Sequence, residues 1–520
     1  MIYLIHNNEQ AVEVLDDHLQ VMKVDFTSNQ LTTQLFELAS LYPKQLIAWC
    51  YLELKPSLNP DGFNKVFHHE KIMASFNPSN HNYLLDALGY VDRSYFYKAN
   101  KSVMYPTWLM SSMVGGVHAS VLHTVRHHID ISSNFNYFLL SFAKQGMPQG
   151  LFCYSSPELL LKDTIVEVKK VAFEEATEAI LFKFVKQHYK WVWVFFLALA
   201  YVVYEKQLPI VALLKSLFFK QQHLDFNLEK LKINSLKQVN STSTVDVIIP
   251  TIGRKQYLYD VLVDLSKQTL LPKTVVIVEQ NPEPNSISEL DYLTIQDWPF
   301  VIDHTFTHQT GVCNARNIAL SKTQSEWVLL GDDDNRFDAN LIENLLDSAI
   351  NYGIKAATTV YLQPHEKQTF MDTAQTSIFG AGNTLIHSSL LKTVKFDMRY
   401  EFNYGEDTDF GMQIRYQGED VVFFSDIKIT HLKAPFGGYR TKVKQLWEDD
   451  LIQPKPSPTI YLLQSTYFTP KQLNGYQLLL GLKEYKGSNI KNPFKFVKQF
   501  KAKWKKSAEW SQILTQSINA

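Results

Sequence analysis

The sequence has few cysteines, almost no net charge and no long apolar run. Its 520 residues include only three cysteines, Cys50, Cys153 and Cys313, which lie far apart and form no CxxC pair. Cysteines spaced in this way predict neither a zinc site nor a disulfide framework, and they fit a reducing cytosol. The balance of 51 basic against 52 acidic side chains argues against a chain that binds nucleic acid over its whole surface.

The apolar segments are short. The N-terminus, MIYLIHNNE, has no basic region, and its apolar run is too short for a signal peptide. The strongest apolar run, WVWVFFLALAYVVY at residues 191–204, is shorter than the ~20 residues that cross a bilayer. We therefore expect a buried or interfacial helix there, and a cytoplasmic protein that could be peripheral at the inner face of the plasma membrane.

The chain does contain ample material for large hydrophobic cores. Its hydrophobic fraction is 45%, with 33 Phe and 26 Tyr, so disorder is not the default expectation. Single cores stop growing near ~250–300 residues, which predicts two to four domains. The polar stretch NSLKQVNSTST at residues 234–244 is typical of a linker between two halves.

Strand and helix patterns alternate after this linker. Residues 245–250 (VDVIIP) read as a strand, residues 257–265 as an amphipathic helix, and residues 274–278 (TVVIV) as the next strand. This is a βαβ unit, and the continuous Val and Ile runs predict strands buried on both faces. A third strand at residues 327–330 ends in an Asp triplet. Because ligands of open α/β sheets bind at the carboxyl ends of the strands, we expect a site there.

The Asp triplet, Asp332-Asp333-Asp334, predicts a metal site. Hard cations such as Mg²⁺ and Mn²⁺ prefer carboxylate oxygens, and an Asp-x-Asp at a strand end offers two of them in one turn. The alternative is structural, with the acids only capping the helix expected at residues 340–350.

Further motifs surround the triplet in the second half of the chain. They are VIIPTIGR at residues 247–254, QTLLP at 268–272, GVCNARN at 311–317 and GEDTDF at 405–410. In this order and spacing the set resembles the inverting family 2 glycosyltransferases, over roughly residues 244–440. The resemblance extends to GAGNTLI at 380–386 and to His431 ahead of GGYR at 437–440. It implies a GT-A fold, which is an α/β, Rossmann-like domain with a mostly parallel sheet and helices on both faces.

The resemblance also implies a site. Transfer of a sugar from a nucleotide diphosphate needs a divalent cation at the diphosphate, groups that hold the nucleotide, and a base for the acceptor hydroxyl. The family's metal positions fall on Asp332, Asp334 and His431, with Mn²⁺ or Mg²⁺ as cofactor. Its base falls on Asp407, with Glu406 beside it. Nucleotide-sugar contacts are implied at Pro250, Thr251, Arg254, Glu279, Arg316, Asp332 and Asp333.

Several of these positions have other readings. Glu279 stands where the family usually carries Asp, and QNPEP at residues 280–284 replaces the usual Asp-Gly-Ser. Arg316 could form a structural salt bridge, and His431 could be structural rather than a ligand. The three acids Glu406, Asp407 and Asp409 are rivals for the role of base, or are simple N-terminal charges on a helix. Crowding should raise the pKa of at least one of them, which suits a base.

The first half contains a faint copy of the second. Residues 134–146 align without a gap on residues 406–418, at an offset of 272, and Phe152 then falls on Phe424. Residues 118–125 align on residues 387–394 at an offset of 269. Two matches in the same order indicate an internal duplication, although chance similarity of amphipathic helices is the alternative. Asn134 and Phe135 stand where the second half has Glu406 and Asp407, so the copy would have lost its chemistry.

These patterns predict four regions. Residues 1–170 form a degenerate GT-A-like domain through which the chain could form oligomers, and residues 171–240 form a helical segment and linker. Residues 241–450 form the catalytic domain, and residues 451–520 form a C-terminal helical extension. The basic, aromatic tail at residues 491–506 could lie on an anionic membrane, or could pack its aromatic face on the protein.

We therefore expect a metal-dependent glycosyltransferase. It would move a sugar from a nucleotide-diphosphate sugar to a hydroxyl of a glycan or lipid-linked acceptor, in cell-surface polysaccharide biosynthesis. A single base and a leaving diphosphate on opposite sides of the sugar predict inversion. The alternatives are a nucleotidyltransferase, which also uses paired acids, and a non-catalytic sugar-nucleotide or glycan-binding protein.

Overall fold

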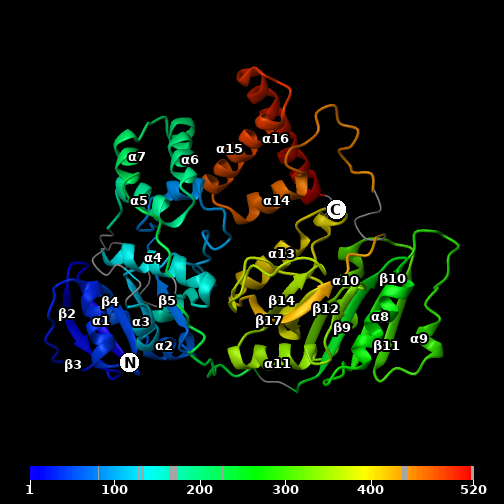
Figure 1. The fold of residues 1–520 in the computed structure, drawn as a ribbon, viewed down its shortest axis with the longest axis horizontal. Helices are drawn as coiled ribbons and strands as arrows, with labels where there is room; N and C mark the ends of the chain where they lie inside the picture. Colours follow the sequence, from blue (N-terminus) through cyan, green and yellow to red (C-terminus); the bar gives the residue numbers. More distant parts are fainter. Residues whose placement is uncertain are drawn as a thin grey trace. The chain divides into compact units, whose positions relative to one another are not determined.

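The computed structural model describes all residues except 80, 127–128, 130–133, 163–173, 225, 240–241, 436–442 and 517–520. The chain divides into two compact units. Unit 1 comprises Met1–Lys237 and Tyr467–Lys483, and unit 2 comprises Gln238–Thr466 and Glu484–Ala520. Each unit is a mixed sheet with helices packed on it (Figure 1).

The sheet of unit 2 is parallel at one end and mixed at the other. Its order is β11-β10-β9-β12-β16-β14-β17-β13, and β15 pairs with β17. The first four strands are parallel neighbours, β16 runs antiparallel to both β12 and β14, and β17 runs parallel to β14. The strands are β9 (Val245–Thr251), β10 (Thr274–Gln280), β11 (Val301–Thr307), β12 (Trp327–Gly331), β13 (Asn335–Phe337), β14 (Ala356–Leu362), β15 (Ala374–Gln375), β16 (Asn383–His387) and β17 (Val422–His431).

Helices cover both faces of this sheet because alternate strand residues point to opposite sides. Ile248 and Val328 pack in one core with residues of α10 and α13. Val247 is next to Ile248 in β9, and Leu329 is next to Val328 in β12. Both point to the opposite face, where they line a pocket with Val261 and Leu265 of α8. The helices of this unit include α8 (Lys255–Ser266), α9 (Tyr292–Ile295), α10 (Val312–Lys322), α11 (Leu341–Tyr352), α12 (Ser388–Leu391), α13 (Glu406–Tyr416) and α16 (Pro493–Gln516).

The parallel strands bring the expected site residues to one edge. Within β9 and β10, Pro250 is opposite Val278 and Thr251 is opposite Glu279. β12 runs parallel to β9 and ends at Gly331, just before the Asp triplet. The predicted α/β architecture of residues 244–440 is therefore confirmed.

Unit 1 is built on a second mixed sheet, of order β3-β2-β1-β4-β7-β5-β8-β6. Its strands are β1 (Ile2–His6), β2 (Ala11–Leu15), β3 (Val21–Met22), β4 (Leu46–Tyr51), β5 (Ile72–Phe76), β6 (Tyr105–Pro106), β7 (Val114–His118) and β8 (Phe152–Ser155). Its helices are α1 (Leu31–Leu41), α2 (Pro60–Val66), α3 (Ala119–Val125), α4 (Phe135–Gly146), α5 (Glu178–His188), α6 (Val192–Ala200) and α7 (Ile210–Ser216), and a π-helical turn, Tyr201–Glu205, continues α6.

The two sheets share one strand plan. The sequence of neighbours β1-β4-β7-β5-β8 repeats in β9-β12-β16-β14-β17, with the same parallel and antiparallel pairings. His118 and His387 both cap a helix by accepting a hydrogen bond from the backbone N–H two residues on. The degenerate GT-A-like character expected of the first half agrees with this plan.

One part of the internal alignment does not hold. The paired registers place Tyr154 of β8 where Val422 of β17 stands, so the offset in this strand is 268 rather than 272. The extension of the alignment from Phe152 to Phe424 is therefore wrong. The reason is local, because the connection from helix to strand in unit 1 holds an extra turn, Met147–Gln149, closed by Gly150 at φ +85°.

The C-terminal helices divide between the units. α14 spans Pro458–Tyr467 and α15 spans Pro470–Gly487. Most of α15 belongs to unit 1, where Gln472 donates hydrogen bonds to the carbonyls of Asp92 and Ser94. The close approach at Gly475, where an added Cβ would lie 2.2 Å from the Tyr90 carbonyl oxygen, explains how α15 packs there. The expected extension at residues 451–520 thus supplies helices to both units.

Within unit 2, α16 buries much of the aromatic face that the sequence placed in the tail. Phe496 and Phe500 are buried, and their rings stack on one another at 6.0 Å between centroids. Trp504 packs edge-on against Tyr461 of α14. The helix therefore packs these aromatic rings on the protein. From the sequence, this packing was the alternative to contact of the tail with a membrane. Among the described residues, no helix is long and apolar enough to cross a membrane.

Candidate active site

The three aspartates after β12 point to three different sets of partners. Asp332 accepts hydrogen bonds from Arg316 (3.0 Å) and from the Tyr361 hydroxyl (2.9 Å). Asp333 turns into the protein, and Asp334 faces His431. Three consecutive aspartates can reach different partners because successive side chains point in different directions from an extended or turning backbone.

Asp333 ties the loop after β9 to the triplet. Its carboxylate accepts hydrogen bonds from Thr251 Oγ1 (2.7 Å) and Arg254 Nη1 (2.7 Å). Burial raises the pKa of Asp333 to about 6, even though the Arg254 guanidinium acts in the opposite direction. Both of its oxygens are therefore committed inside the protein, and Asp333 holds Thr251 and Arg254 in place.

Asp332, Asp334 and His431 form a group that could hold a metal ion. One ligand atom from each lies within 4.8 Å of the others. Asp334 Oδ1 is buried, accepts no hydrogen bond from the described residues, and faces His431 Nε2 at 3.3 Å. A buried carboxylate oxygen left in this state needs a cation near it. Two carboxylates and one imidazole fit Mn²⁺ or Mg²⁺, so the residues present fit the expected cofactor.

The pairing of β13 with β17 explains why a residue so far along the chain joins this group. Asn335, the residue after Asp334, is opposite His431 in the antiparallel register. The Leu432 amide donates to the Asp334 carbonyl (2.9 Å), and the Ala434 amide donates to its carboxylate (2.9 Å). Burial would raise the pKa of Asp334, but His431 and the Ala434 amide outweigh it and leave the pKa below its usual value. The same contact with Asp334 raises the pKa of His431.

Arg316 connects the metal group to the candidate base. Its Nη2 lies 3.0 Å from Asp332 Oδ1, and its Nη1 lies 3.6 Å from Asp407 Oδ1. The guanidinium is almost fully buried, with 6% of the side chain exposed. One fixed cation therefore holds the carboxylates of Asp332 and Asp407 toward the same space.

Asp407 lies in the first turn of α13, with Glu406 before it. Its Oδ1 is buried, although 40% of the side chain as a whole is exposed. One side of the carboxyl group therefore faces the protein and the other faces solvent. Burial raises the pKa of Asp407 to about 7, although Arg316 opposes the rise and Glu406 adds to it. Asp409, a rival for the role of base, is buried and accepts a hydrogen bond from Gln413.

Two glycines allow close packing beneath the site. An added Cβ at Gly382 would lie 2.1 Å from Asp332 Oδ2, and one at Gly380 would lie 1.8 Å from Asn383 Oδ1. The Asn383 side chain donates to Thr359 and holds β16 to β14. These contacts give a physical reason for the GAGN sequence, because only hydrogen fits where the loop passes the metal group.

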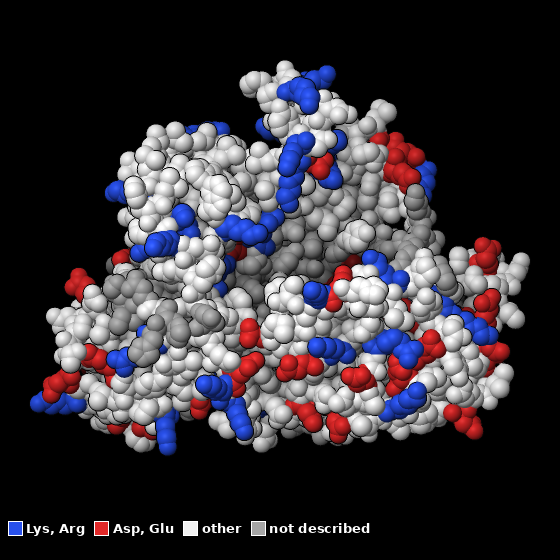
Figure 2. Space-filling model, in the orientation of Figure 1, with Lys and Arg blue, Asp and Glu red and all other residues white. Residues whose placement is uncertain are grey.

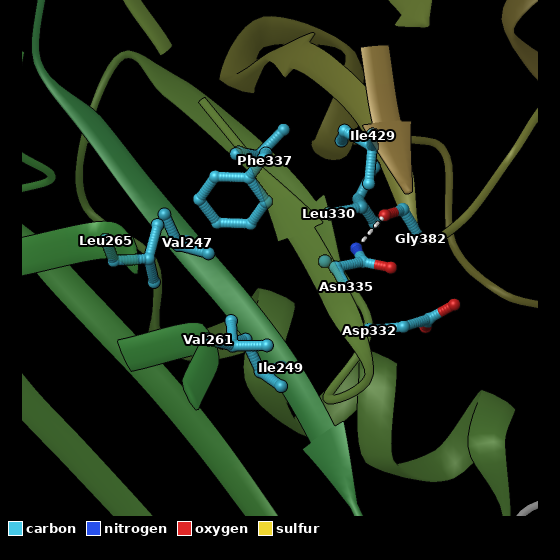
Figure 3. Close-up of a pocket in the computed structure, with 12 residues that line it drawn as sticks. Val247, Ile249, Val261, Leu265, Leu330, Asp332, Asn335, Phe337, Gly382 and Ile429 are labelled. Atoms are coloured by element: carbon cyan, nitrogen blue, oxygen red, sulfur yellow. Dashed lines mark hydrogen bonds between the residues drawn. The ribbon is translucent and has the colours of Figure 1, made fainter. Parts of the chain in front are cut away.

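A mostly apolar pocket lies behind Asp332 (Figure 3). Its empty volume is about 250 Å³, and Val247, Ile249, Leu329, Phe337 and Ile429 line most of it. Asn335 closes one side by donating to the Gly382 carbonyl (2.7 Å), as drawn in Figure 3. The apolar lining makes this pocket part of the packing behind the triplet rather than a place for a nucleotide.

Glu279, at the end of β10, already has three partners. It accepts hydrogen bonds from Ser288 Oγ (2.5 Å) and the Glu289 amide (3.3 Å), and it lies 2.9 Å from His304 Nε2. Burial alone would raise its pKa, but these partners hold the pKa below its usual value. Its predicted contact with a nucleotide base or ribose stays a prediction.

Sequence reasoning missed two residues that shape the site. Tyr361 on β14 donates to Asp332 and to Asn335 Oδ1 (2.7 Å), and its ring stacks on His431. Glu401 accepts hydrogen bonds from the amides of Cys313 and Asn314, which begin α10 and so position Arg316. Gly311, whose φ is +134°, allows Glu401 to approach this closely, since an added Cβ there would lie 2.5 Å from its carboxylate.

Most of the predicted residues meet in one cluster. Pro250 lies at the end of β9 beside it. The members that contact one another through hydrogen bonds or ion pairs are Thr251, Arg254, Arg316, Asp332, Asp333, Asp334, Asp407 and His431. The GGYR motif at residues 437–440 lies outside the described residues.

Comparison with known proteins gives both a family and a set of distant structural likenesses. Residues 246–403 match the model described as glycosyl transferase family 2. No curated protein sequence matches the chain significantly.

Among solved structures, TarS of S. aureus is 17% identical at a TM-score of 0.33, and the match covers 45% of this chain and 42% of that one. A structure of TarS 1-349 in complex with UDP-GlcNAc is 16% identical at a TM-score of 0.35, covering 45% and 70%. A structure of GalNAc-T7 with UDP, GalNAc and Mn²⁺ is 12% identical at a TM-score of 0.30, covering 40% and 45%.

The matched residues, 246–403, hold the loop after β9, Arg316, the Asp triplet and the GAGN loop, all of which converge on one cluster of charges. The second unit of this chain therefore carries a family 2 glycosyltransferase domain.

Proposed function

We propose that unit 2 is a metal-dependent, inverting glycosyltransferase. It moves a sugar from a nucleotide-diphosphate donor to a hydroxyl of a glycan or lipid-linked acceptor, in cell-surface polysaccharide biosynthesis. Asp332, Asp334 and His431 would hold Mn²⁺ or Mg²⁺, which would supply positive charge for the departing diphosphate. Thr251, Arg254 and Arg316 line the nucleotide-sugar side of this group, with Pro250 and Glu279 at the neighbouring strand ends.

The proposed reaction is a single displacement. Asp407 accepts the proton of the acceptor hydroxyl as its oxygen forms a bond to the anomeric carbon. The bond from that carbon to the diphosphate oxygen breaks, and the nucleoside diphosphate leaves with the electron pair. Attack from the side opposite the leaving group inverts the anomeric centre. Glu406, beside Asp407, adds to the electrostatic field that raises the pKa of the base.

The observation that carries this proposal is the double contact of Arg316. The buried guanidinium contacts Asp332 at 3.0 Å and Asp407 at 3.6 Å, which supports a cation site and a base that face the same space. Such preorganisation is what charge stabilisation in a transition state requires. It also favours an enzyme over a nucleotide-binding module, because binding alone needs no second carboxyl group with a pKa near 7.

The first test is a thermal-shift and hydrolysis screen. UDP-, GDP-, dTDP- and CMP-sugars are added to the full chain with Mn²⁺ or Mg²⁺. A donor at ~100-fold excess over its Kd should stabilise the protein by about 2.7 kcal/mol. We expect one nucleotide class to give a metal-dependent shift together with slow hydrolysis.

Two substitutions make this screen specific. Asp334→Ala should abolish the metal-dependent shift, while Asp426→Ala, which changes an exposed aspartate of β17, should leave it intact. A shift without any turnover would favour a sugar-nucleotide-binding protein. Release of pyrophosphate from a nucleoside triphosphate and a sugar phosphate would instead indicate a nucleotidyltransferase.

We also propose that unit 1 is a degenerate, non-catalytic copy of unit 2, derived by duplication, and a surface for oligomer formation. The shared strand plan supports this proposal, as does the identity of the residues at its strand ends. Tyr51 occupies the position in the β4–β7 register that Asp332 occupies after β12, and Glu53, exposed, is the nearest acid.

The location proposed for the protein is the cytoplasm, at the inner face of the plasma membrane. A lipid-linked acceptor would make contact with that face necessary. Residues 491–506 supply exposed lysines such as Lys498 and Lys501 to this contact. Phe496 and Phe500 do not take part in it, because both rings are buried in the protein.

A further inference from the structure

A large apolar surface is exposed on the α6–α7 hairpin of unit 1. On α6 and its π-helical continuation, the exposed residues are Val192, Phe195, Leu199 and Val202. Their spacing of three to four residues places them along one side of the helix. Trp191, 62% exposed, begins this stripe.

The second helix carries a matching stripe. Its exposed apolar residues are Leu208, Ile210, Val211, Leu214, Leu217 and Phe218. Phe218 is 88% exposed and Val211 is 64% exposed, so these side chains meet almost nothing in the protein. α6 and α7 pack on one another and on α5, and we call their two exposed stripes together the hairpin face. Contiguous apolar surfaces of this kind mark sites of interaction.

The charges within the hairpin itself are nearly all positive. Lys190, Lys206, Lys215 and Lys220 are exposed beside it. The single acid between residues 190 and 220 is Glu205, which is held in an ion pair with Lys471 at 2.8 Å and in a hydrogen bond from Tyr90. In the view of Figure 2, the surface over α6 and α7 is mostly uncharged, with Lys and Arg at its margins.

This charge pattern decides between two occupants. A second copy of the chain would place the same lysines opposite one another across a two-fold interface, and like charges in that position are unfavourable. An anionic lipid surface attracts each of them, while the acyl region receives the apolar side chains between them.

We infer that the hairpin face, residues 190–220, docks unit 1 on a bilayer that contains anionic lipids. Trp191, Phe195, Val211, Leu214 and Phe218 enter the boundary between headgroups and acyl chains, and the surrounding lysines contact the lipid phosphates. This contact involves no residue of the site in unit 2 and does not depend on its activity.

The test is co-sedimentation of the full chain with vesicles. One set of vesicles is phosphatidylcholine alone, and the other is an equal mixture of phosphatidylcholine and phosphatidylglycerol. We expect binding to the mixture, weakened by salt, and little binding to phosphatidylcholine. The double variant Val211→Ser with Phe218→Ser should lose most of this binding, because it removes two of the most exposed apolar side chains of the face.

Matched controls separate this face from other exposed residues. Val21 and Leu236 in unit 1 are 71% and 80% exposed, so Val21→Ser with Leu236→Ser should leave vesicle binding unchanged. Lys215→Gln with Lys220→Gln should weaken binding roughly fivefold for each lysine. The same change at Lys498 and Lys501 of α16 should have a much smaller effect. Thermal unfolding of each variant, compared with that of the unaltered chain, reports whether unit 1 stays folded.

The opposite results would overturn the inference. Equal loss of binding in the Val21 and Leu236 control, or loss only when the α16 lysines change, would place the contact elsewhere. Absence of binding by the unaltered chain to anionic vesicles would also reject it. If Val211→Ser with Phe218→Ser instead dissociates a dimer seen by light scattering, and no vesicle binding is present, the hairpin face is an interface between copies.

Discussion

The two units share a strand plan but fill the same edge of the sheet in opposite ways. In unit 2 that edge holds Arg316, Asp332 and Asp407, which are charged groups held in mutual contact. In unit 1 the corresponding edge holds aromatic rings, with Phe135 packed against His6 and Trp49 at 5.7 and 5.8 Å between centroids. Burial of rings stabilises a fold, whereas burial of charges costs stability unless each is paired.

The comparison continues one strand further. The β4–β7 and β12–β16 registers place Met113 of unit 1 where unit 2 has Gly382. Met113 is buried and fills space, while Gly382 leaves room for the Asp332 carboxylate. The same arrangement of strands can therefore be formed with or without a cluster of charged residues. The residues just beyond the strand ends decide whether it carries a site.

The largest expected effect is on turnover in unit 2. Asp407→Asn should lower kcat by roughly 10²–10⁴-fold, because the amide cannot accept the acceptor's proton. Donor affinity should change little, since Arg316 and the metal group remain. Steady-state kinetics beside donor-dependent thermal shifts check this, with Asp426→Asn as the control. Unchanged kcat would shift the role of base to Glu406 or Asp409.

The next effect is on stability and belongs to unit 1. Phe135→Ala should destabilise unit 1 by ~3–5 kcal/mol, because it removes a buried ring from the cluster with His6 and Trp49. The equivalent change in unit 2, Asp407→Ala, should leave stability nearly unaltered or increase it. Denaturant unfolding of the full chain, followed by proteolysis to assign each transition, measures both. Equal losses in the two variants would remove the contrast between the units.

A smaller effect is expected from Gly382→Ala. A Cβ at this position would lie 2.1 Å from Asp332 Oδ2, so the carboxylate must move. Displacement by about 1 Å at a reacting centre can cost roughly 10²-fold in rate. We expect such a loss in kcat with raised metal requirement, measured by titration with Mn²⁺. Met113→Ala at the equivalent place in unit 1 should leave kcat as it is.

The smallest effect concerns pH. Burial lowers the pKa of His188 to about 3, from an ordinary 6.5. This histidine is neutral in the folded state and takes up a proton on unfolding, so unit 1 should lose stability as pH falls below about 6.5. The loss between about pH 7.5 and pH 5.5 should be roughly 1 kcal/mol for this residue.

His188→Phe tests this assignment. Both ring nitrogens of His188 are buried without hydrogen-bond partners among the described residues, and the ring packs against Phe184. Phenylalanine should keep the packing and flatten the pH dependence of unfolding by that amount. An unchanged slope would place the sensitivity on another group, such as His6, whose pKa burial lowers to about 4.

Local sequence determined the architecture and the list of candidate residues. Continuous apolar runs such as residues 245–250 and 274–278 became parallel strands, and the polar residues after them fell at one edge. These features depend on periodicity and on turn chemistry, which act between near neighbours in the chain. The position of the Asp triplet after a strand therefore predicted a metal site, whereas Asp407 was singled out by the resemblance to a known family.

Only the tertiary structure decided what each of these residues contacts. The resemblance implied a nucleotide-sugar contact for Asp333, and it is the fold that buries this residue against Thr251 and Arg254 and brings Asp332 and Asp334 together with His431. Tyr361 and Glu401 enter the site through strand pairing and helix capping across long separations in the chain. The apolar run at residues 191–204 likewise did not indicate which side of the helix would be buried and which would be exposed to solvent. Contacts of this kind depend on how whole elements pack, and no local pattern carries that information.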